Sequence, residues 1–303
     1  MKAPKNIGVS VRDRLTERAR ERRENAQLLM TRCVIERVLY RLSVSSHRSR
    51  FVLKGAMLFS LWAPVPYRAT GDLDLLGFGE NTPAAIAAVF VEILATQVAN
   101  DGVVFRPETL RAAAAREQDE YAGVRLDFVA ELGGARLPMH VDIGYGDVIT
   151  PAPVDIEYPS LLEQPAPHLR AYPPETVVAE KFQAMVALDM LNSRMKDFFD
   201  LWAIAGAFTF EGEVLARAIK TTFEHRETPL PSKKPLALTA GFAEVKQVQW
   251  AAFLRRTEIA LAPEPLPAIQ TRIAEFVMPP TLAAAEAAPF NVRWTAGGSW
   301  IDG

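Results

Sequence analysis

The sequence contains a single cysteine, Cys33, among its 303 residues. One thiol excludes an internal disulfide and a metal cluster held by cysteines, and its apolar neighbours indicate a place in the core. The four histidines are scattered, with no pair at a metal-binding spacing, which argues against zinc. No apolar run approaches the ~20 residues that cross a bilayer, and the first residues lack the apolar core of a signal peptide. These absences predict a cytoplasmic protein.

Charge is nearly balanced over the whole chain, at −2, but it is unevenly distributed. Residues 1–50 carry thirteen Lys and Arg against five Asp and Glu, a net +8, which leaves −10 for the rest. The basic residues alternate with apolar residues at helical spacing, so we expect an amphipathic helix. Its charged face is either a solvated surface or a surface that meets the phosphate backbone of RNA. In the second case Arg18 and Arg22 are the candidate RNA-binding residues.

Turn and capping signals divide the first half of the chain. A short apolar strand turns into a helix at Lys54-Gly55, and Thr82 followed by a proline predicts the start of another helix. Two apolar runs flank Gly133-Gly134, which predicts a β-hairpin. The first half therefore mixes strands with helices.

The second half of the chain has a helical pattern. Residues 151–174 contain seven prolines, which predicts an extended surface connection before it. The last stretch has no clear period, and we expect a tail that packs Trp294 and Trp300 on the body. The sequence thus predicts an α+β fold. Its expected parts are a basic helical segment packed on the core at 1–50, the core at 51–165, and a mostly helical C-terminal domain and tail at 166–303.

Two aspartates, Asp72 and Asp74, stand one residue apart in the apolar run "GDLDLLG". Side chains two residues apart on a strand point to the same face, about 5–7 Å apart. Two like charges at ~4 Å repel by roughly 4 kcal/mol at an effective dielectric constant of 20. A divalent cation relieves this repulsion, and Mg²⁺ is commonly held by one or two carboxylates together with substrate phosphates. The pair predicts a metal site for phosphoryl chemistry, with a solvent-facing pair as the alternative.

A third carboxylate would complete a site for two metal ions. Asp142 lies in the second strand of the expected hairpin and is the preferred candidate. Asp127, in the first strand, is the competing one. Upstream, the Lys54-Gly55 turn lets backbone N–H groups approach a phosphate, and Thr70 is either a phosphate partner or a turn residue.

These residues resemble the first signature of the nucleotidyltransferase toxins of the AbiEii/AbiGii type. The signature is a lysine-glycine turn, followed about a dozen residues later by Arg-x-Ser/Thr-x-Asp-x-Asp. The stretch "VLKGAMLFSLWAPVPYRATGDLDLLGFG" matches it. The matching positions are Lys54, Gly55, Arg68, Thr70, Asp72 and Asp74. The chain departs from the family pattern at Ala56, where a glycine or serine is common, so a hydroxyl contact there is not expected.

A second signature of that family is similar to "PPETVVAEKFQAMVALDMLNSRMKDFFDLW". The matching positions are Glu180, Lys181, Arg194, Lys196, Asp197 and Asp200. In the functional interpretation Lys181 and Lys196 reach the triphosphate, Arg194 contacts phosphate or caps a helix, and Asp197 positions the nucleophile or a lysine. Asp200 lies at i,i+4 from Lys196 and would support it structurally. The alternative is a pair of salt-bridged surface helices.

The resemblance implies a nucleotidyltransferase fold, a small mixed sheet followed by helices that close a nucleotide cleft. It also implies an enzyme that uses Mg²⁺ (or Mn²⁺) and a nucleoside triphosphate (NTP) to modify RNA such as the tRNA 3′ end. Such a toxin would act in a toxin-antitoxin or abortive-infection system against phage, with a cognate antitoxin protein encoded nearby. The alternatives are an acceptor that is a small molecule or a protein side chain, and a non-catalytic binding member of the fold.

Overall fold

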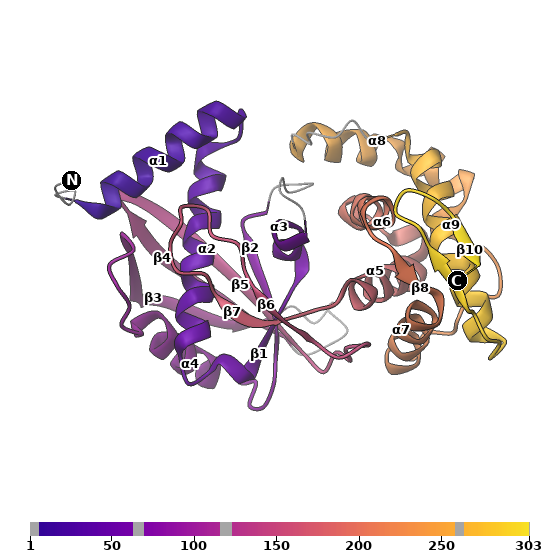
Figure 1. The fold of residues 1–303 in the computed structure, drawn as a ribbon, viewed down its shortest axis with the longest axis horizontal. Coiled ribbons are helices and arrows are strands. Elements are labelled where there is room, and N and C mark those ends of the chain that lie inside the picture. Colours follow the sequence, from indigo (N-terminus) through magenta and orange to yellow (C-terminus); the bar gives the residue numbers. More distant parts are fainter. Residues whose placement is uncertain (1–5, 63–69, 116–122, 258–263, 303) are drawn as a thin grey trace. The chain divides into compact units, whose positions relative to one another are not determined.

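The protein is described by a computed structural model over residues 6–62, 70–115, 123–257 and 264–302. The chain forms two compact units (Figure 1). Unit 1 consists of Met1–Gly146 and Val154–Ala171, and unit 2 consists of Asp147–Pro153 and Tyr172–Gly303. Unit 1 therefore extends beyond residue 165, where the sequence suggested that the core ends. The reason is that the proline-rich stretch supplies two strands to the sheet of unit 1 instead of running as a plain surface connection.

Among the described residues, unit 1 is built on a mixed sheet of seven strands in the order β3-β4-β5-β2-β1-β7-β6 (Figure 1). The strands are β1 (Phe51–Lys54), β2 (Asp72–Gly77), β3 (Val103–Ala114), β4 (Gly123–Leu132), β5 (Ala135–Tyr145), β6 (Val154–Glu157) and β7 (His168–Ala171). Strand β2 pairs in parallel with β5 on one side and antiparallel with β1 on the other. The predicted hairpin is confirmed, because β4 and β5 pair antiparallel around the Gly133-Gly134 turn.

The helices of unit 1 are α1 (Ile7–Arg22), α2 (Ala26–Val44), α3 (Leu58–Trp62) and α4 (Pro83–Ala95). Short 3-10 turns cover Arg48–Arg50 and Gly55–Met57. The Thr82 side chain accepts a hydrogen bond from the Ala85 N–H, so the predicted cap of α4 is confirmed.

The expectation of one continuous N-terminal helix was wrong. Arg23 adopts a left-handed conformation with φ of 55° and ends α1. The Asn25 side chain then accepts from the Leu28 N–H at 3.0 Å and begins α2. A polar cap and a left-handed residue interrupt the helix although the apolar spacing runs on.

The sheet of unit 1 has one apolar face and one polar face. Helices α2 and α4 contact strands β3, β4 and β5. Residues of β4 and β5 alternate between buried apolar and partly exposed polar side chains, as expected for strands with one covered face. The buried set includes Leu126, Phe128, Val141 and Ile143. The polar set includes Arg125, Asp127, His140 and Asp142.

Unit 2 is mostly helical, as the sequence predicted. Its helices are α5 (Pro174–Leu188), α6 (Met195–Ala207), α7 (Gly212–His225), α8 (Ala240–Thr257) and α9 (Leu266–Ala285), with 3-10 turns at Asp189–Leu191 and Leu236–Leu238. In the described part of this unit a small sheet of three strands has the order β10-β9-β8. These strands are β8 (Phe210–Glu211), β9 (Val292–Trp294) and β10 (Trp300–Asp302).

The C-terminal stretch is more regular than its sequence indicated. Helix α9 continues through Pro279 and Pro280, and the tail then forms β9 and β10. The packing of both tryptophans is confirmed. Trp294 is 1% exposed and its indole N–H donates to the Ala205 carbonyl, while the Trp300 indole donates to the Phe276 carbonyl. None of the described helices is long and apolar enough to cross a bilayer.

Candidate active site

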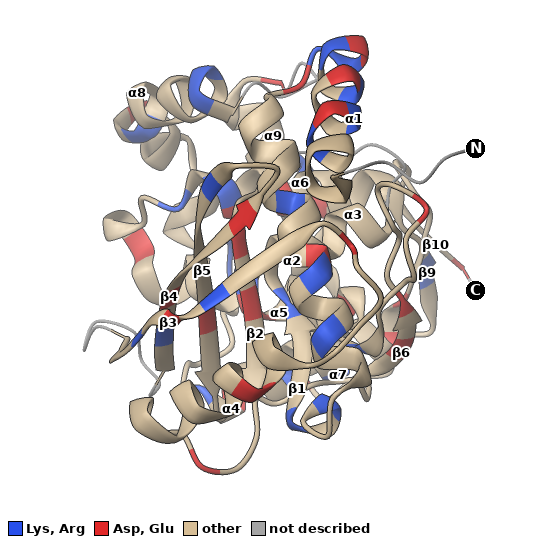
Figure 2. Cartoon of the chain, turned by 90° about the vertical axis from the view of Figure 1, so that its left-hand side faces the viewer, with Lys and Arg blue, Asp and Glu red and all other residues tan. Residues whose placement is uncertain are grey.

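Asp72 and Asp74 lie on the polar face of β2, in the middle of the sheet of unit 1. Leu73 and Leu75, which alternate with them, are fully buried, whereas Asp72 is exposed and Asp74 is half-buried. The strand is therefore one-sided at this point, with two carboxylates on the face opposite the apolar core. Figure 2 shows acidic residues along β2. This arrangement is the one that the D-x-D spacing predicted.

The glycine turn that follows β1 lies directly against Asp74. A Cβ atom at Gly55 would be 2.0 Å from the Asp74 Oδ2 atom, so only a glycine fits there. Lys54 is the antiparallel partner of Asp74 across β1 and β2. The Thr70 hydroxyl accepts from the backbone N–H of Asp72 at 3.4 Å, a local turn contact. Arg68, the remaining position of the first signature, is outside the described residues.

Asp142 lies beside the D-x-D pair. It is the parallel register partner of Asp74 across β2 and β5, so the two carboxylates share one face. Both oxygens of Asp142 accept hydrogen bonds from the Arg125 guanidinium, at 2.7 and 2.8 Å. This bidentate contact raises the pKa of Arg125 above its ordinary value.

Asp127 is farther from the pair along the sheet. It lies on β4, which does not neighbour β2, and its register partner is His140 on β5. His140 is in turn the register partner of Asp72. The His140 Nδ1 atom is 2.5 Å from an Asp127 oxygen, a local hydrogen bond between neighbouring strands. Sequence reasoning missed Arg125, although its position two residues before Asp127 places it on the same strand face.

The carboxylates on β2 suit a cation whose remaining ligands come from the phosphates of a bound substrate. Among the residues the structure describes, no three carboxylates, imidazoles or thiols are arranged to hold a metal ion as they stand. Asp142, the preferred candidate for a third carboxylate, is paired with Arg125. Asp72 and Asp74 alone match the way Mg²⁺ is usually bound, through one or two carboxylates and the phosphates of a substrate.

A second cluster of charged residues lies within unit 2. Lys181 on α5 is held between two buried carboxylates on α6, at 2.6 Å from Asp197 and 2.8 Å from Asp200. Asp197 is also 2.6 Å from the Nε atom of Arg194. Both carboxylates are essentially inaccessible, whereas the Arg194 side chain is 47% exposed. The cluster therefore joins the start of α6 to α5 with a cation at its centre.

The expected support of Lys196 by Asp200 was wrong. Lys196 is exposed, and in the described part of the chain Asp200 forms its ion pair with Lys181 instead. A buried carboxylate pairs with a cation that reaches it inside the protein, which here is Lys181, whereas the Lys196 side chain is exposed to solvent.

Glu180, the neighbour of Lys181 in the second signature, belongs to a different network. It is 3.4 Å from Arg226, which also pairs with Asp147 at 2.8 Å. The Tyr172 hydroxyl donates to Glu180 at 3.3 Å. Burial first, and then the charges of Glu180 and Asp147, raise the pKa of Tyr172 above its ordinary value. Sequence reasoning missed Asp147 and Arg226, because 79 residues separate them.

The two candidate RNA-binding arginines lie on α1, in unit 1. Arg22 is exposed and Arg18 is half-buried, with its guanidinium donating to the Leu161 carbonyl. Helix α1 carries acidic as well as basic residues, as the mixed colours of Figure 2 show. The helix is therefore not uniformly basic.

Comparison with known proteins finds solved structures of similar fold. The chain is similar in fold to a candidate nucleotidyltransferase from Helicobacter pylori, with a TM-score of 0.53 and 12% identity over 88% of this chain and 100% of that one. JHP933, also from Helicobacter pylori, gives a TM-score of 0.52 and 13% identity over 87% of this chain and 95% of that one. At these identities the likeness concerns the fold. No curated protein matches the sequence.

The family model described as "Nucleotidyl transferase AbiEii toxin, Type IV TA system" matches residues 37–275. The matched range is most of the chain and includes the D-x-D strand of unit 1 and the Lys181 cluster of unit 2. The chain thus belongs to the AbiEii family of nucleotidyltransferase toxins from type IV toxin-antitoxin systems.

Proposed function

We propose that this nucleotidyltransferase moves a nucleotide from an NTP to an RNA acceptor such as the 3′ end of a tRNA, with Mg²⁺ or Mn²⁺ bound at the D-x-D strand. The observation that carries the proposal is the placement of Asp72 and Asp74 on one polar strand face, with the Lys54-Gly55 turn packed against Asp74. Phosphate oxygens can bind at the backbone of the glycine turn, and a cation can bind beside them at the paired carboxylates.

In this reaction a hydroxyl oxygen of the acceptor forms a bond to the α-phosphorus of the NTP. The bond from that phosphorus to the oxygen that bridges the β-phosphate breaks, pyrophosphate leaves, and the hydroxyl proton passes to water. The protein contributes position and charge, since the reacting groups come from the two substrates.

Asp72 and Asp74 are the residues that would hold the cation, with Asp142 as the third carboxylate. Asp142 is preferred over Asp127 because its strand neighbours β2 and its side chain stands opposite Asp74. A divalent ion bound there offsets the repulsion of the carboxylates and stabilises charge on the transferred phosphate. Arg125 then has to give up at least one of its two contacts with Asp142.

In unit 2 the exposed cations Arg194 and Lys196 are proposed partners of phosphate. Lys181 is proposed to hold Asp197 and Asp200 in place and to contribute positive charge at the same time, since its side chain retains 14% exposure. Lysine is a compact charge suited to phosphate oxygens, and arginine adds a planar fork.

Membership of a toxin-antitoxin family implies a cognate antitoxin. We propose that this antitoxin is a protein encoded nearby, that the toxin acts in the cytoplasm, and that the system serves defence against phage. The acceptor RNA would then be a host molecule whose modification stops growth.

The direct test is incubation of the protein with each labelled NTP and total RNA in the presence of Mg²⁺. We expect label in RNA, in the size range of tRNA, from one or a few of the four nucleotides. Label that appears in protein or in a small molecule instead would assign a different acceptor. No incorporation with any nucleotide, by a folded protein with Mg²⁺ or Mn²⁺, would contradict the proposal.

A further inference from the structure

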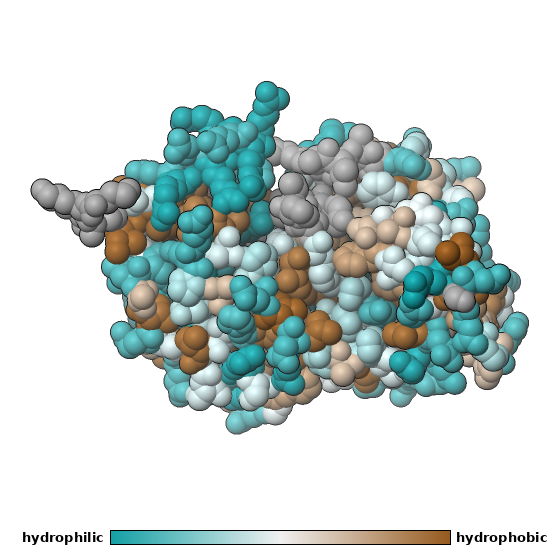
Figure 3. Space-filling view, viewed as in Figure 1, coloured by the Kyte–Doolittle hydropathy of each residue, from teal (hydrophilic) through white to brown (hydrophobic). Residues whose placement is uncertain are grey.

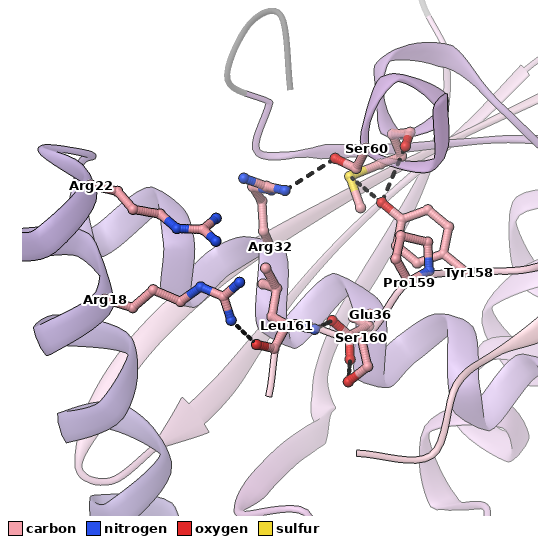
Figure 4. Close-up of a pocket in the computed structure, with 10 residues that line it drawn as sticks. Arg18, Arg22, Arg32, Glu36, Ser60, Tyr158, Pro159, Ser160 and Leu161 are labelled. Carbon is pink, nitrogen blue, oxygen red and sulfur yellow. Dashed lines mark hydrogen bonds between the residues drawn. The ribbon is translucent and has the colours of Figure 1, made fainter. Parts of the chain in front are cut away.

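Unit 1 contains a small pocket between α1, α2, α3 and the segment that follows β6 (Figure 4). Its volume is about 100 Å³. The lining includes three arginines, Arg18 and Arg22 from α1 and Arg32 from α2, together with Ser60 from α3. The pocket therefore gathers positive charge from two helices.

The three guanidinium groups have few partners. Arg32 donates to the Ser60 hydroxyl at 3.1 Å, and its Nε atom is buried without a hydrogen-bond partner. Arg18 donates to a backbone carbonyl, at Leu161. Among the described residues Arg22 forms no ion pair, although Figure 4 shows its side chain directed toward Arg32. The arginines thus retain donors for a ligand.

The one acidic residue of the lining is already engaged. Glu36 accepts from the Ser160 hydroxyl at 2.9 Å and from the Leu161 N–H at 2.8 Å. It also forms a buried ion pair with Arg37 at 2.5 Å, outside the pocket. The oxygens of Glu36 are therefore engaged by other groups, and its single negative charge offsets only part of the positive charge of the three arginines.

The positive charge of the pocket is only partly compensated by the protein. Burial lowers the pKa of Arg32, Tyr158, Glu24 and Glu36 raise it, and the charge of Arg22 lowers it. A concentration of like charges with unused donors is stabilised by an anion, and guanidinium groups match the oxygens of phosphate with several hydrogen bonds. The residues that line the pocket are therefore of the kind that bind a phosphate group.

We propose that this three-arginine pocket binds one backbone phosphate of the acceptor RNA. The inference rests on the proposed function, and it gives Arg18 and Arg22 a specific role together with Arg32. A pocket of about 100 Å³ is well below the ~300 Å³ at which pockets for whole small molecules begin, so it accepts a phosphate group and not a nucleoside. That size favours a phosphate presented by a polymer over a free NTP bound as a whole.

The pocket is connected to the D-x-D strand by a short stretch of chain. Ser60 and Met57 line the pocket, and Gly55, a few residues earlier, packs against Asp74. Five residues of helical turn span about 8–10 Å. An RNA phosphate held by the arginines would thus fix the polymer close to the segment that shapes the metal-binding strand. Figure 3 shows hydrophilic residues over most of the visible surface of α1.

The test measures binding of a fluorescently labelled single-stranded oligouridylate across a series of salt concentrations, without NTP. The variants are Arg22→Ala, Arg32→Met and their combination. The matched controls are Arg20→Ala and the pair Arg14→Ala with Arg20→Ala, since both residues are exposed arginines of α1 outside the pocket lining. The same variants are then titrated with ATP and Mg²⁺, and with polyglutamate.

We expect Arg22→Ala to weaken RNA binding by about tenfold, the loss of one charged hydrogen-bonding partner. The double pocket variant should lower the slope of log K against log salt by about 0.7, which is one phosphate of a single strand. The slope should not fall by twice that amount in the double variant, because both arginines hold the same phosphate. The control variants should keep the wild-type slope, and ATP affinity should not change.

Several results would overturn the proposal. If the control pair flattened the salt slope as much as the pocket pair, α1 would be a diffuse basic surface. An equal loss of polyglutamate binding would show that charge alone is recognised, and a loss confined to ATP would assign the pocket to the triphosphate. Arg22→Ala keeps the test decisive if Arg32→Met unfolds. The binding result also stands apart from the labelling experiment, so either proposal can fail alone.

Discussion

The Asp74 carboxylate occupies the space that a side chain at Gly55 would need, with Oδ2 2.0 Å from the position of a Cβ atom. Gly55 also has a positive φ of 73°. Gly55→Ala should therefore displace Asp74 and lower the transfer activity by about 100-fold, since a displacement near 1 Å at a catalytic group costs that much. The measurement is the initial rate of RNA labelling by the folded variant.

Gly134→Ala is the matched control for backbone strain. Gly134 has a φ of 84° but nothing within 4 Å of its Cβ position. The Gly134→Ala variant should lose about 1–2 kcal/mol of stability and keep its transfer activity. Equal activity in the two variants would show that the contact of Gly55 with Asp74 does not matter for the reaction.

Asp72→Ala and Asp74→Ala should each abolish transfer with little loss of folding. Removing a carboxylate that holds the metal ion should cost about 10³-fold or more in rate. Without metal, the melting temperature should stay the same or rise, because two like charges no longer face each other. Asp155→Ala, at an exposed carboxylate of β6, serves as the control. An Asp72 or Asp74 variant within about tenfold of the wild-type rate would place the metal elsewhere.

The third carboxylate can be identified by a pair of isosteric changes. Asp142→Asn should lower activity by at least about 100-fold, whereas Asp127→Asn, one strand farther from β2, should stay close to wild type. Arg125→Gln should lower the Mg²⁺ concentration that gives half-maximal rate, because the guanidinium no longer competes for Asp142. The reverse order of the two aspartate variants would make Asp127 the ligand, and an unchanged Mg²⁺ requirement would separate Arg125 from metal binding.

Lys181→Ala should destabilise unit 2 by about 3–5 kcal/mol, because it leaves Asp197 and Asp200 buried without their shared cation. Lys196→Ala removes an exposed lysine from the same region and should change stability by no more than about 0.5 kcal/mol. Denaturant unfolding gives both values. If Lys196 contacts the triphosphate, its variant should raise KM for NTP at an unchanged melting temperature. Equal stability of the two variants would be inconsistent with a buried clamp at Lys181.

Cys33 should not react with thiol reagents in the folded protein. Burial raises its pKa from 9.0 to about 12, and the side chain is 1% exposed. Because the folded pKa is the higher one, the stability contributed by the protonated thiol is complete below pH ~9 and is lost as the pH rises toward 12. Modification by a disulfide reagent at pH 8 should be absent in the native state and complete in denaturant. Rapid stoichiometric reaction of the native protein would contradict the burial of this residue.

Local signals predicted the local structure well. The Gly133-Gly134 turn, the Thr82 cap and the alternation around Asp72 each act within a few residues, so the hairpin, α4 and the one-sided strand could be read from the sequence. The end of α1 at Arg23 was not predicted, because the apolar spacing continues across it. The end of α9 was also not predicted, because the last stretch has no clear period although the helix continues through Pro279 and Pro280.

The side-chain partners were harder to predict than the elements. The pairing of Asp74 with Asp142 depends on two strands that become neighbours although 68 residues separate the two aspartates. Sequence spacing at i,i+4 favoured Lys196 as the partner of Asp200, but burial selected Lys181 from another helix. Tertiary packing determines which side chains pair, and the periodicity of the sequence carries no information about that packing.

The division of the chain into interleaved segments has a consequence for synthesis and for truncation. Unit 1 is completed by Val154–Ala171, after the chain has already contributed Asp147–Pro153 to unit 2. A fragment that ends at Gly146 would lack β6 and β7 and would leave the buried strand β1 as a bare edge, which invites association with other chains. During translation that edge stays open until residue 171 leaves the ribosome. A toxin chain cut short within this window would therefore aggregate rather than accumulate as an active half.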